Sequence, residues 1–301
     1  MHTIRLPIGY PGLAQLPCSR QHSAVAWAAQ VLYKLPCMSA NTAPAVPRLA
    51  ATILVLRDTQ QGLEVLMVTR HHEIDFMPGA LVFPGGKLAK NDEDPRVGGR
   101  CSGVENLSLE QIALRVNAIR EVFEESGILL ARGRGSSALL GAERATQLAE
   151  RYRQQLATGA IGIADLLEAE DLVLACEELV PFARWITPTF MPKRFDTYFY
   201  LAAAPAAQIA VHDGKEMVDA QWIRPADALA EQAAGKRNIV TATLLNLHKL
   251  NRHSTVSAAI DRAAVRPIVT VTPELVEGPR GRILLIPEAA DYGVTEFFLG
   301  N

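Results

Sequence analysis

Three glutamates near the middle of the chain have a spacing that suits metal binding. Glu121, Glu124 and Glu125 share one side of a predicted helix, because residues at i, i+3 and i+4 are neighbours on a helical surface. They repel one another, and the helix dipole disfavours anions near the C-terminal end. A hard divalent cation held by carboxylate oxygens reverses both effects. The spacing therefore indicates a metal site, with a solvated acidic helix face as the alternative.

Two neighbouring features favour the metal site. Arg120 precedes Glu121 and stands four residues before Glu124, where its guanidinium can orient a carboxylate. Upstream, an apolar run ends in Phe83-Pro84-Gly85-Gly86-Lys87. Paired glycines let backbone amides approach a phosphate closely. The residues together indicate a site for a metal ion and a phosphate-bearing ligand.

Gly86 and the segment Arg120-Glu121-Val122-Phe123-Glu124-Glu125-Ser126-Gly127-Ile128 resemble the Nudix box. That box runs Gly, five residues, Glu, seven residues, then Arg-Glu-apolar-any-Glu-Glu-any-Gly-apolar. The second half matches at every specified position. The first half departs, because about twenty extra residues separate Gly86 from Arg120. Asp92 stands where the box has its first Glu, with Glu93 and Asp94 as alternatives.

The flanking sequence resembles one branch of the Nudix hydrolases, the coenzyme A diphosphatases. Seven positions of that branch's signature are in register here: Leu66, Arg70, Gly79, Phe83, Pro84, Gly85 and Gly86. Val68, His71 and Asp75 depart from it, and Asp75 replaces a cation with an anion. The peroxisomal mammalian enzymes of this branch also carry an insertion in the box. Their later segments resemble residues 185–188 and 194–197 of this chain, so the resemblance covers roughly residues 48–250.

The resemblance implies an α/β Nudix fold, with a mixed β-sheet sandwiched between helices, an inserted loop in the box and extra helices. It also implies Mg²⁺ or Mn²⁺ as cofactor. The predicted metal site comprises Glu121, Glu124, Glu125 and Gly86. The predicted catalytic set is Arg120, Glu121, Glu124, Glu125 and Glu216, the last as a further ligand or base. The predicted substrate-binding residues are Arg70, Phe83, Gly85 and Arg194.

Three functions remain open at this point. The first is hydrolysis of the diphosphate in coenzyme A or an acyl derivative. The second keeps the chemistry but acts on ADP-ribose, NADH or a nucleotide sugar. The third is a Nudix-fold binding or regulatory protein without turnover, which the intact acids of the box disfavour. The predicted partner is a small nucleotide-derived molecule, with a homodimer left open.

The helix that carries the box has clear ends. Ser108 followed by Gln111 forms a capping-box pattern, and Gly127 suits the C-terminal cap, so we predict a helix over residues 109–126. Strands are expected over 50–57 and 63–70, which form a hairpin, and over 80–83, 183–186, 197–202, 217–223 and 282–286. Further helices are expected over 142–156, 163–167, 225–234 and 238–250. Residues 87–107 are polar and rich in glycine, which predicts an exposed excursion.

The composition fits a globular enzyme and excludes several classes. The 301 residues are 49% hydrophobic and carry a formal net charge of −2, which argues against a nucleic-acid-binding surface. No apolar run approaches the roughly 20 residues of a membrane helix, so we expect no membrane span and a cytoplasmic protein. We expect residues 1–47 to be a disordered or mis-assigned extension, although a targeting peptide is an alternative since the first 57 residues lack acids. A domain over 48–250 and a packed extension over 251–301 complete the prediction.

Overall fold

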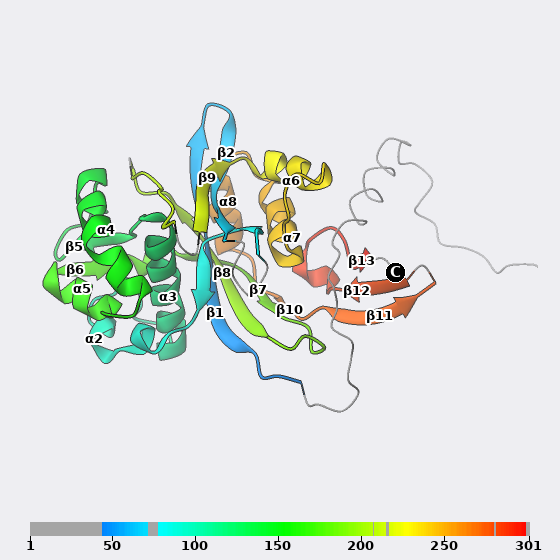
Figure 1. Ribbon diagram of the computed structural model, residues 1–301, viewed down its shortest axis with the longest axis horizontal. Helices are drawn as coiled ribbons and strands as arrows, with labels where there is room; N and C mark the ends of the chain where they lie inside the picture. The colour runs from blue at the N-terminus through cyan, green and yellow to red at the C-terminus, as the bar shows by residue number, and fades with distance from the viewer. Residues whose placement is uncertain (1–43, 72–77, 207, 215–216, 280, 299–301) are drawn as a thin grey trace, which may run out of the picture.

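The computed structural model describes residues 44–71, 78–206, 208–214, 217–279 and 281–298. It has a mixed α/β architecture, in which a large sheet is covered by helices on both faces (Figure 1). This is the fold class expected from the sequence. Residues 1–43 of the N-terminal extension predicted over residues 1–47 lie outside the described residues, so the alternatives for it stay predictions.

Eight strands of the described chain form the central sheet, in the order β10-β7-β8-β1-β2-β3, with β4 paired to β1 and β9 paired to β2. The strands are β1 (Arg48–Thr59), β2 (Gly62–Arg70), β3 (Leu81–Val82), β4 (Gly85–Lys87), β7 (Val180–Ile186), β8 (Phe195–Ala203), β9 (Met217–Ile223) and β10 (Thr270–Val271). β1 and β8 are parallel, and β10 and β7 are parallel, while the other pairs are antiparallel. The predicted hairpin of β1 and β2 is present.

The central strand β1 is apolar along most of its length because both faces of the sheet are covered. Ile53 and Val55 point into the core on one face, while Leu54 and Leu56 point into the core on the other. All four side chains are fully buried. A strand buried on both faces reads as a continuous apolar run rather than an alternation, which is how this segment appears in the sequence.

The two faces carry different helices (Figure 1). One face packs against α3 (Leu109–Ser126), α4 (Ala142–Ala157) and α5 (Ile163–Ala169), beside a small sheet of β5 (Ala131–Gly133) and β6 (Leu172–Leu174). The other packs against α6 (Pro225–Ala233), α7 (Thr241–Leu250) and α8 (Val256–Ala264). A second sheet of β11 (Glu274–Gly278), β12 (Gly281–Leu285) and β13 (Glu296–Phe298) lies beside these helices.

The prediction of an exposed excursion over residues 87–107 is wrong in part. The segment forms a 3-10 turn η1 (Lys90–Glu93) and a short helix α2 (Pro95–Gly98), and it packs against α3 and α5. Asp92 and Val97 are only 2% exposed. Arg96 forms ion pairs with Asp165 and Glu168 of α5. The insertion is therefore a folded part of the α3 face.

The C-terminal region contributes to the main core. Ala259 of α8, Val271 of β10 and Leu284 of β12 belong to the same buried cluster as Leu54 and Leu56. The sequence analysis predicted a packed extension here with one strand, near β12, and did not predict α8 or the other strands. No helix among the described residues is long and apolar enough to cross a membrane.

Candidate functional site

Helix α3 begins and ends as the sequence predicts. The Ser108 hydroxyl accepts from the Gln111 amide at 3.2 Å, and the Gln111 side chain accepts from the Ser108 amide at 2.9 Å. Gly127 adopts the left-handed conformation, with φ of 78°, and its amide donates to Phe123 O at the end of the helix. These caps fix the register of the helix, and with it the direction in which the predicted acids point.

The three glutamates of α3 are buried, so the solvated acidic face is not what this helix presents. Glu121 and Glu124 are each 9% exposed and Glu125 is 3% exposed. The glycine turn and the insertion cover this side of the helix, since α3 contacts both β4 and η1. Burying carboxylates costs free energy unless they are hydrogen-bonded or paired.

Arg120 organises two of these acids. Its Nη1 donates to Glu124 Oε1 at 3.0 Å, and its Nη2 donates to Glu121 Oε1 at 2.9 Å. Its Nε and Nη2 also donate to the two oxygens of Asp92, at 2.6 and 2.9 Å. Burial opposes the charge of Arg120, yet the bonds to Asp92 and the charges of the glutamates keep its pKa well above the ordinary value.

Of the three acids considered at the first glutamate position of the box, Asp92 is the one that faces this network. It accepts from Arg120 and also from the side chain of Asn117 at 3.1 Å. Glu93 is exposed. Asp94 instead caps α2 by accepting from the Arg96 amide. The residue at the box's own first-glutamate position therefore supplies an acid to this network, despite the extra residues that separate it from Arg120.

Asn117 is a site residue that the sequence analysis missed. It is fully buried, and its Oδ1 accepts from the Ala51 amide at 3.0 Å while its Nδ2 donates to Lys87 O at 3.0 Å. It thus joins β1, the end of β4 and the network around Arg120. The available signal was a lone asparagine next to the apolar residues Val116 and Ala118 of the helix.

The glycine turn lies directly against the acids. The Gly85 amide donates to Glu125 Oε2 at 3.0 Å. A Cβ on Gly86 would lie 2.4 Å from Glu121 Oε1, and a Cβ on Gly85 would lie 2.5 Å from Ala51 O. Any larger residue at either position would displace the backbone or a buried carboxylate. The Gly85–Gly86 turn and the acids of α3, which the sequence analysis assigned to one site, are thus in direct contact.

The site has more negative than positive charge. Asp92, Glu121 and Glu124 pair with Arg120, and Glu125 accepts from the Gly85 amide. Arg153 donates to the backbone oxygen of Glu124. Burial and the charges of Glu124 and Asp92 together raise the pKa of Glu121 to about 7, against the opposing effect of Arg120. Carboxylate oxygens are the donors that Mg²⁺ and Mn²⁺ prefer. The donor set therefore fits a hard divalent cation, although no three such side chains of the described residues converge on one point.

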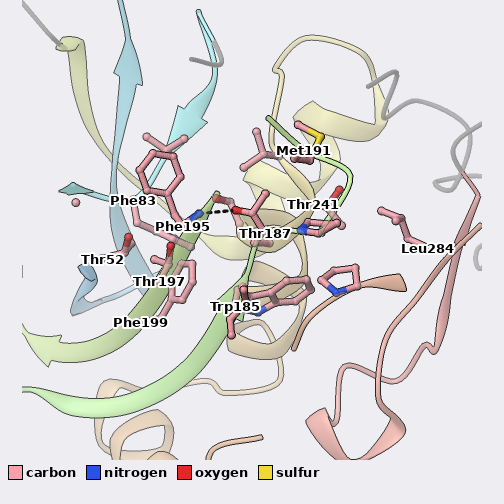
Figure 2. A pocket seen from close by; sticks show the side chains of 18 of the residues that line it. Thr52, Phe83, Trp185, Thr187, Met191, Phe195, Thr197, Phe199, Thr241 and Leu284 are labelled. Atoms are coloured by element: carbon pink, nitrogen blue, oxygen red, sulfur yellow. Dashed lines mark hydrogen bonds between the residues drawn. The ribbon is translucent and has the colours of Figure 1, made fainter. Parts of the chain in front are cut away.

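The predicted substrate-binding residues divide into two groups. Arg70, Phe83 and Gly85 line one cavity of about 240 Å³ beside the glycine turn (Figure 2). Arg194 does not line it, because its guanidinium donates to Thr187 O at 2.9 Å and Ala45 O at 2.8 Å. Glu216 lies outside the described residues.

The cavity walls are mostly apolar and come from segments far apart in the sequence, from Thr52 to Leu284. Figure 2 shows Phe83 and Thr52 on one side and Leu284 of β12 on the other. Between them lie Trp185, Thr187, Phe195 and Thr197, which belong to the two later segments singled out in the sequence. The Trp185 indole donates to the Tyr292 hydroxyl at 2.8 Å, and this hydroxyl donates to Asn246 at 2.8 Å. Gly85 joins the cavity to the acidic site.

Comparisons with known proteins agree with this geometry. The NUDT19 Nudix domain family model matches residues 102–250. The putative nudix hydrolase 7 of Caenorhabditis elegans is 28% identical over 67% of this chain and 60% of its own length. The acyl-coenzyme A diphosphatase NUDT19 of Homo sapiens is 27% identical over 56% of this chain and 55% of its own length. The chain thus spans somewhat over half the length of these curated relatives.

A solved structure gives the same picture of the fold. A NUDIX hydrolase from Alicyclobacillus acidocaldarius superimposes with a TM-score of 0.60 at 28% identity. The match covers 74% of this chain and 99% of that protein. The similarity thus takes in nearly the whole of that protein and about three quarters of this chain.

Proposed function

We propose that this chain, which belongs to the Nudix hydrolases and resembles their NUDT19 branch, hydrolyses a diphosphate linkage in a nucleotide-derived substrate. One observation carries the proposal. The buried glutamates of α3 lie directly against the Gly85–Gly86 turn, and Gly85 also lines the neighbouring cavity. A diphosphate held at the turn would therefore stand beside the carboxylates.

Glu121, Glu124 and Glu125 would hold Mg²⁺ or Mn²⁺. Such an ion neutralises charge on the phosphate oxygens and lowers the pKa of a bound water. Gly86 completes this predicted metal site by leaving space for the Glu121 carboxylate, because any side chain there would collide with it. Glu216 stays a prediction as a further ligand or base.

Other residues of the chain hold this arrangement in place. Arg120 orients Glu121 and Glu124, and Asp92 fixes Arg120 from the side of the insertion. The Gly85 amide holds one oxygen of Glu125. Catalytic groups whose rotamers are fixed by hydrogen bonds need little reorganisation during the reaction. The chain thereby presents an ordered set of carboxylates.

For the substrate we propose coenzyme A or an acyl derivative. Arg70 supplies a permanent positive charge at the cavity, which suits a phosphate group. Phe83, Trp185 and Phe195 supply apolar walls, which suit an acyl or pantetheine arm better than the polar ribose of ADP-ribose. Relatives that carry the name acyl-coenzyme A diphosphatase support the same choice. A cytoplasmic location and a homodimer stay predictions.

A substrate panel tests the proposal. We would compare kcat/KM for an acyl-CoA, coenzyme A, ADP-ribose and NADH with Mg²⁺, and identify the phosphorylated products. We expect an acyl-CoA or coenzyme A to be preferred, giving adenosine 3′,5′-bisphosphate and a phosphopantetheine product. If ADP-ribose or NADH were preferred by tenfold, about 1.4 kcal/mol in transition-state binding, the coenzyme A assignment would be dropped. Absence of turnover on every diphosphate would favour the non-catalytic alternative.

A further inference from the structure

A second cavity on the α7–α8 face is lined by five basic side chains among its eleven residues. It has a volume of about 240 Å³ and lies where the C-terminal end of α7 meets α8 and the residues that follow it. Its charged and titratable lining residues are Lys249, Arg252, His253, Arg262, Arg266 and Asp291. We call it the basic cavity. It shares no lining residue with the cavity beside Gly85.

Lys249 is a partly buried cation of this cavity with few acceptors. Its ammonium lies 3.4 Å from Phe182 O and about 5 Å from the ring centroids of Phe182 and Tyr292. Among the described residues, no carboxylate lies within ion-pair distance of it. An ammonium has three donors, so a partly buried lysine with one long hydrogen bond lacks acceptors. Burial lowers the pKa of Lys249 to about 8, with further contributions from Arg266 and Arg252.

One carboxylate serves the arginines of the basic cavity. Asp291 forms ion pairs with Arg252, at 3.3 Å, and with Arg266. The Asp291 backbone oxygen accepts from Arg252 at 2.9 Å. With Lys249 and Arg262 included, four permanent or near-permanent cations face one anion. The dipole of α7 places about half a unit of negative charge at the C-terminal end of the helix. This offsets only a small part of the surplus positive charge.

His253 is affected by the same positive charges. Burial lowers its pKa, and the charges of Arg252, Arg262 and Lys249 lower it further. Burial and the neighbouring cations therefore both favour the neutral form of this histidine. The cavity attracts anions and repels cations.

We propose that the basic cavity binds a small phosphate-bearing anion at a site separate from the catalytic one. A phosphate offers several acceptor oxygens, which match the donors of Lys249 and the flat guanidiniums of Arg252 and Arg262. A hollow of this volume suits a small molecule, whereas a membrane or a nucleic acid needs a broad basic surface. The chain as a whole is weakly acidic, so the concentration of positive charge here is local.

Binding of inorganic phosphate to the full chain tests the proposal. The melting temperature would be followed at pH 7 with EDTA, in sodium phosphate and in sodium chloride of matched ionic strength. We expect a saturable stabilisation by phosphate alone, because a ligand of the native state raises its stability. Arg262→Gln should weaken phosphate binding at least tenfold, and Lys249→Met should do the same. Diphosphate hydrolysis by Arg262→Gln should be unchanged.

Two control variants separate this site from others. Arg134→Gln removes an exposed arginine that pairs with Asp171 near the other face of the sheet, and it should bind phosphate as the wild type does. Arg70→Gln alters the cavity beside Gly85 and should also retain binding. If Arg70→Gln abolished the stabilisation and Arg262→Gln did not, phosphate would be bound at the catalytic site and the proposal would be wrong. Anionic lipid vesicles that bound through Arg262 when phosphate did not would equally overturn it.

Discussion

The two faces of the central sheet carry charge imbalances of opposite sign. On the α3 face, Arg120 is surrounded by Asp92, Glu121 and Glu124, and every one of these side chains is buried. On the α7–α8 face, Lys249 shares a cavity with three arginines and is only partly buried. The acidic surplus is held by a network of short hydrogen bonds, whereas the basic surplus has few acceptors. The difference suggests that the first face is organised for cations and the second for anions.

Removing the central cation of the α3 face should have the largest effect on stability. Arg120→Met leaves three buried carboxylates without their shared donor, and breaking a buried ion pair by removing one partner costs about 3–5 kcal/mol. We expect a fall in Tm on the order of 10 °C, measured by calorimetry. The double variant Arg120→Met/Asp92→Asn should lose less than the sum of the single variants, because the two residues share one network. A fall of under about 1 kcal/mol would contradict the central role given to Arg120.

Removing one acid at a time should affect catalysis more than folding. We expect Glu124→Gln and Glu125→Gln each to remain folded and to lose at least about 100-fold in kcat, roughly 2.7 kcal/mol. Each change keeps the size of the side chain but removes a charge from the proposed metal site. Glu150→Gln, on the exposed side of α4, is the matched control and should be fully active. Near-normal turnover in either site variant would remove that residue from the metal site.

The α3 face also shows how far sequence alone can go. Helix α3 was predicted with its correct ends, because Ser108 and Gly127 are local signals that act within one turn. The acids of the helix were found by their spacing. Their burial was not foreseen, because the cover comes from the insertion and the glycine turn, which are distant in the chain. A helical wheel contains no information about what packs against its polar side.

The α7–α8 face was predicted less completely for a related reason. Helix α8 is only nine residues long, which is shorter than the window of about 11 or more residues over which helical periodicity is read. Strand β10 has two residues and pairs with β7, more than eighty positions earlier in the chain. Leu284 forms part of the cavity beside Gly85, although nothing in its own segment indicates this. Long-range pairing decides these features, and periodicity within a short window does not detect it.

The two arginines predicted to contact phosphate allow a smaller and more specific test. Arg70 lines the cavity beside Gly85, whereas Arg194 does not line it and donates to the backbone oxygens of Thr187 and Ala45. Arg70→Gln should raise KM about tenfold, close to 1.4 kcal/mol, with little change in kcat, because it removes a binding contact. Arg194→Gln, assayed as folded protein, should keep KM within about twofold of the wild type. A larger KM effect for Arg194 than for Arg70 would mean that the substrate approaches from the other side of β8.

The smallest effect that we expect concerns the pH dependence of stability on the basic face. Burial and the neighbouring arginines lower the pKa of Lys249 to about 8, while an unfolded lysine keeps a pKa near 10.5. Between these values the unfolded chain binds more protons than the folded one, so the free energy of unfolding rises with pH. Below about pH 8 both states are protonated and the full penalty for the buried ammonium is present.

Lys249→Met lacks this group, so we expect the wild type to gain stability relative to the variant from pH 8 to pH 10. Denaturant unfolding of both proteins at each pH measures the difference, and a constant difference would show that Lys249 titrates normally. Saturating phosphate at pH 7 should reduce the penalty in the wild type, since an anion beside Lys249 stabilises its charged form.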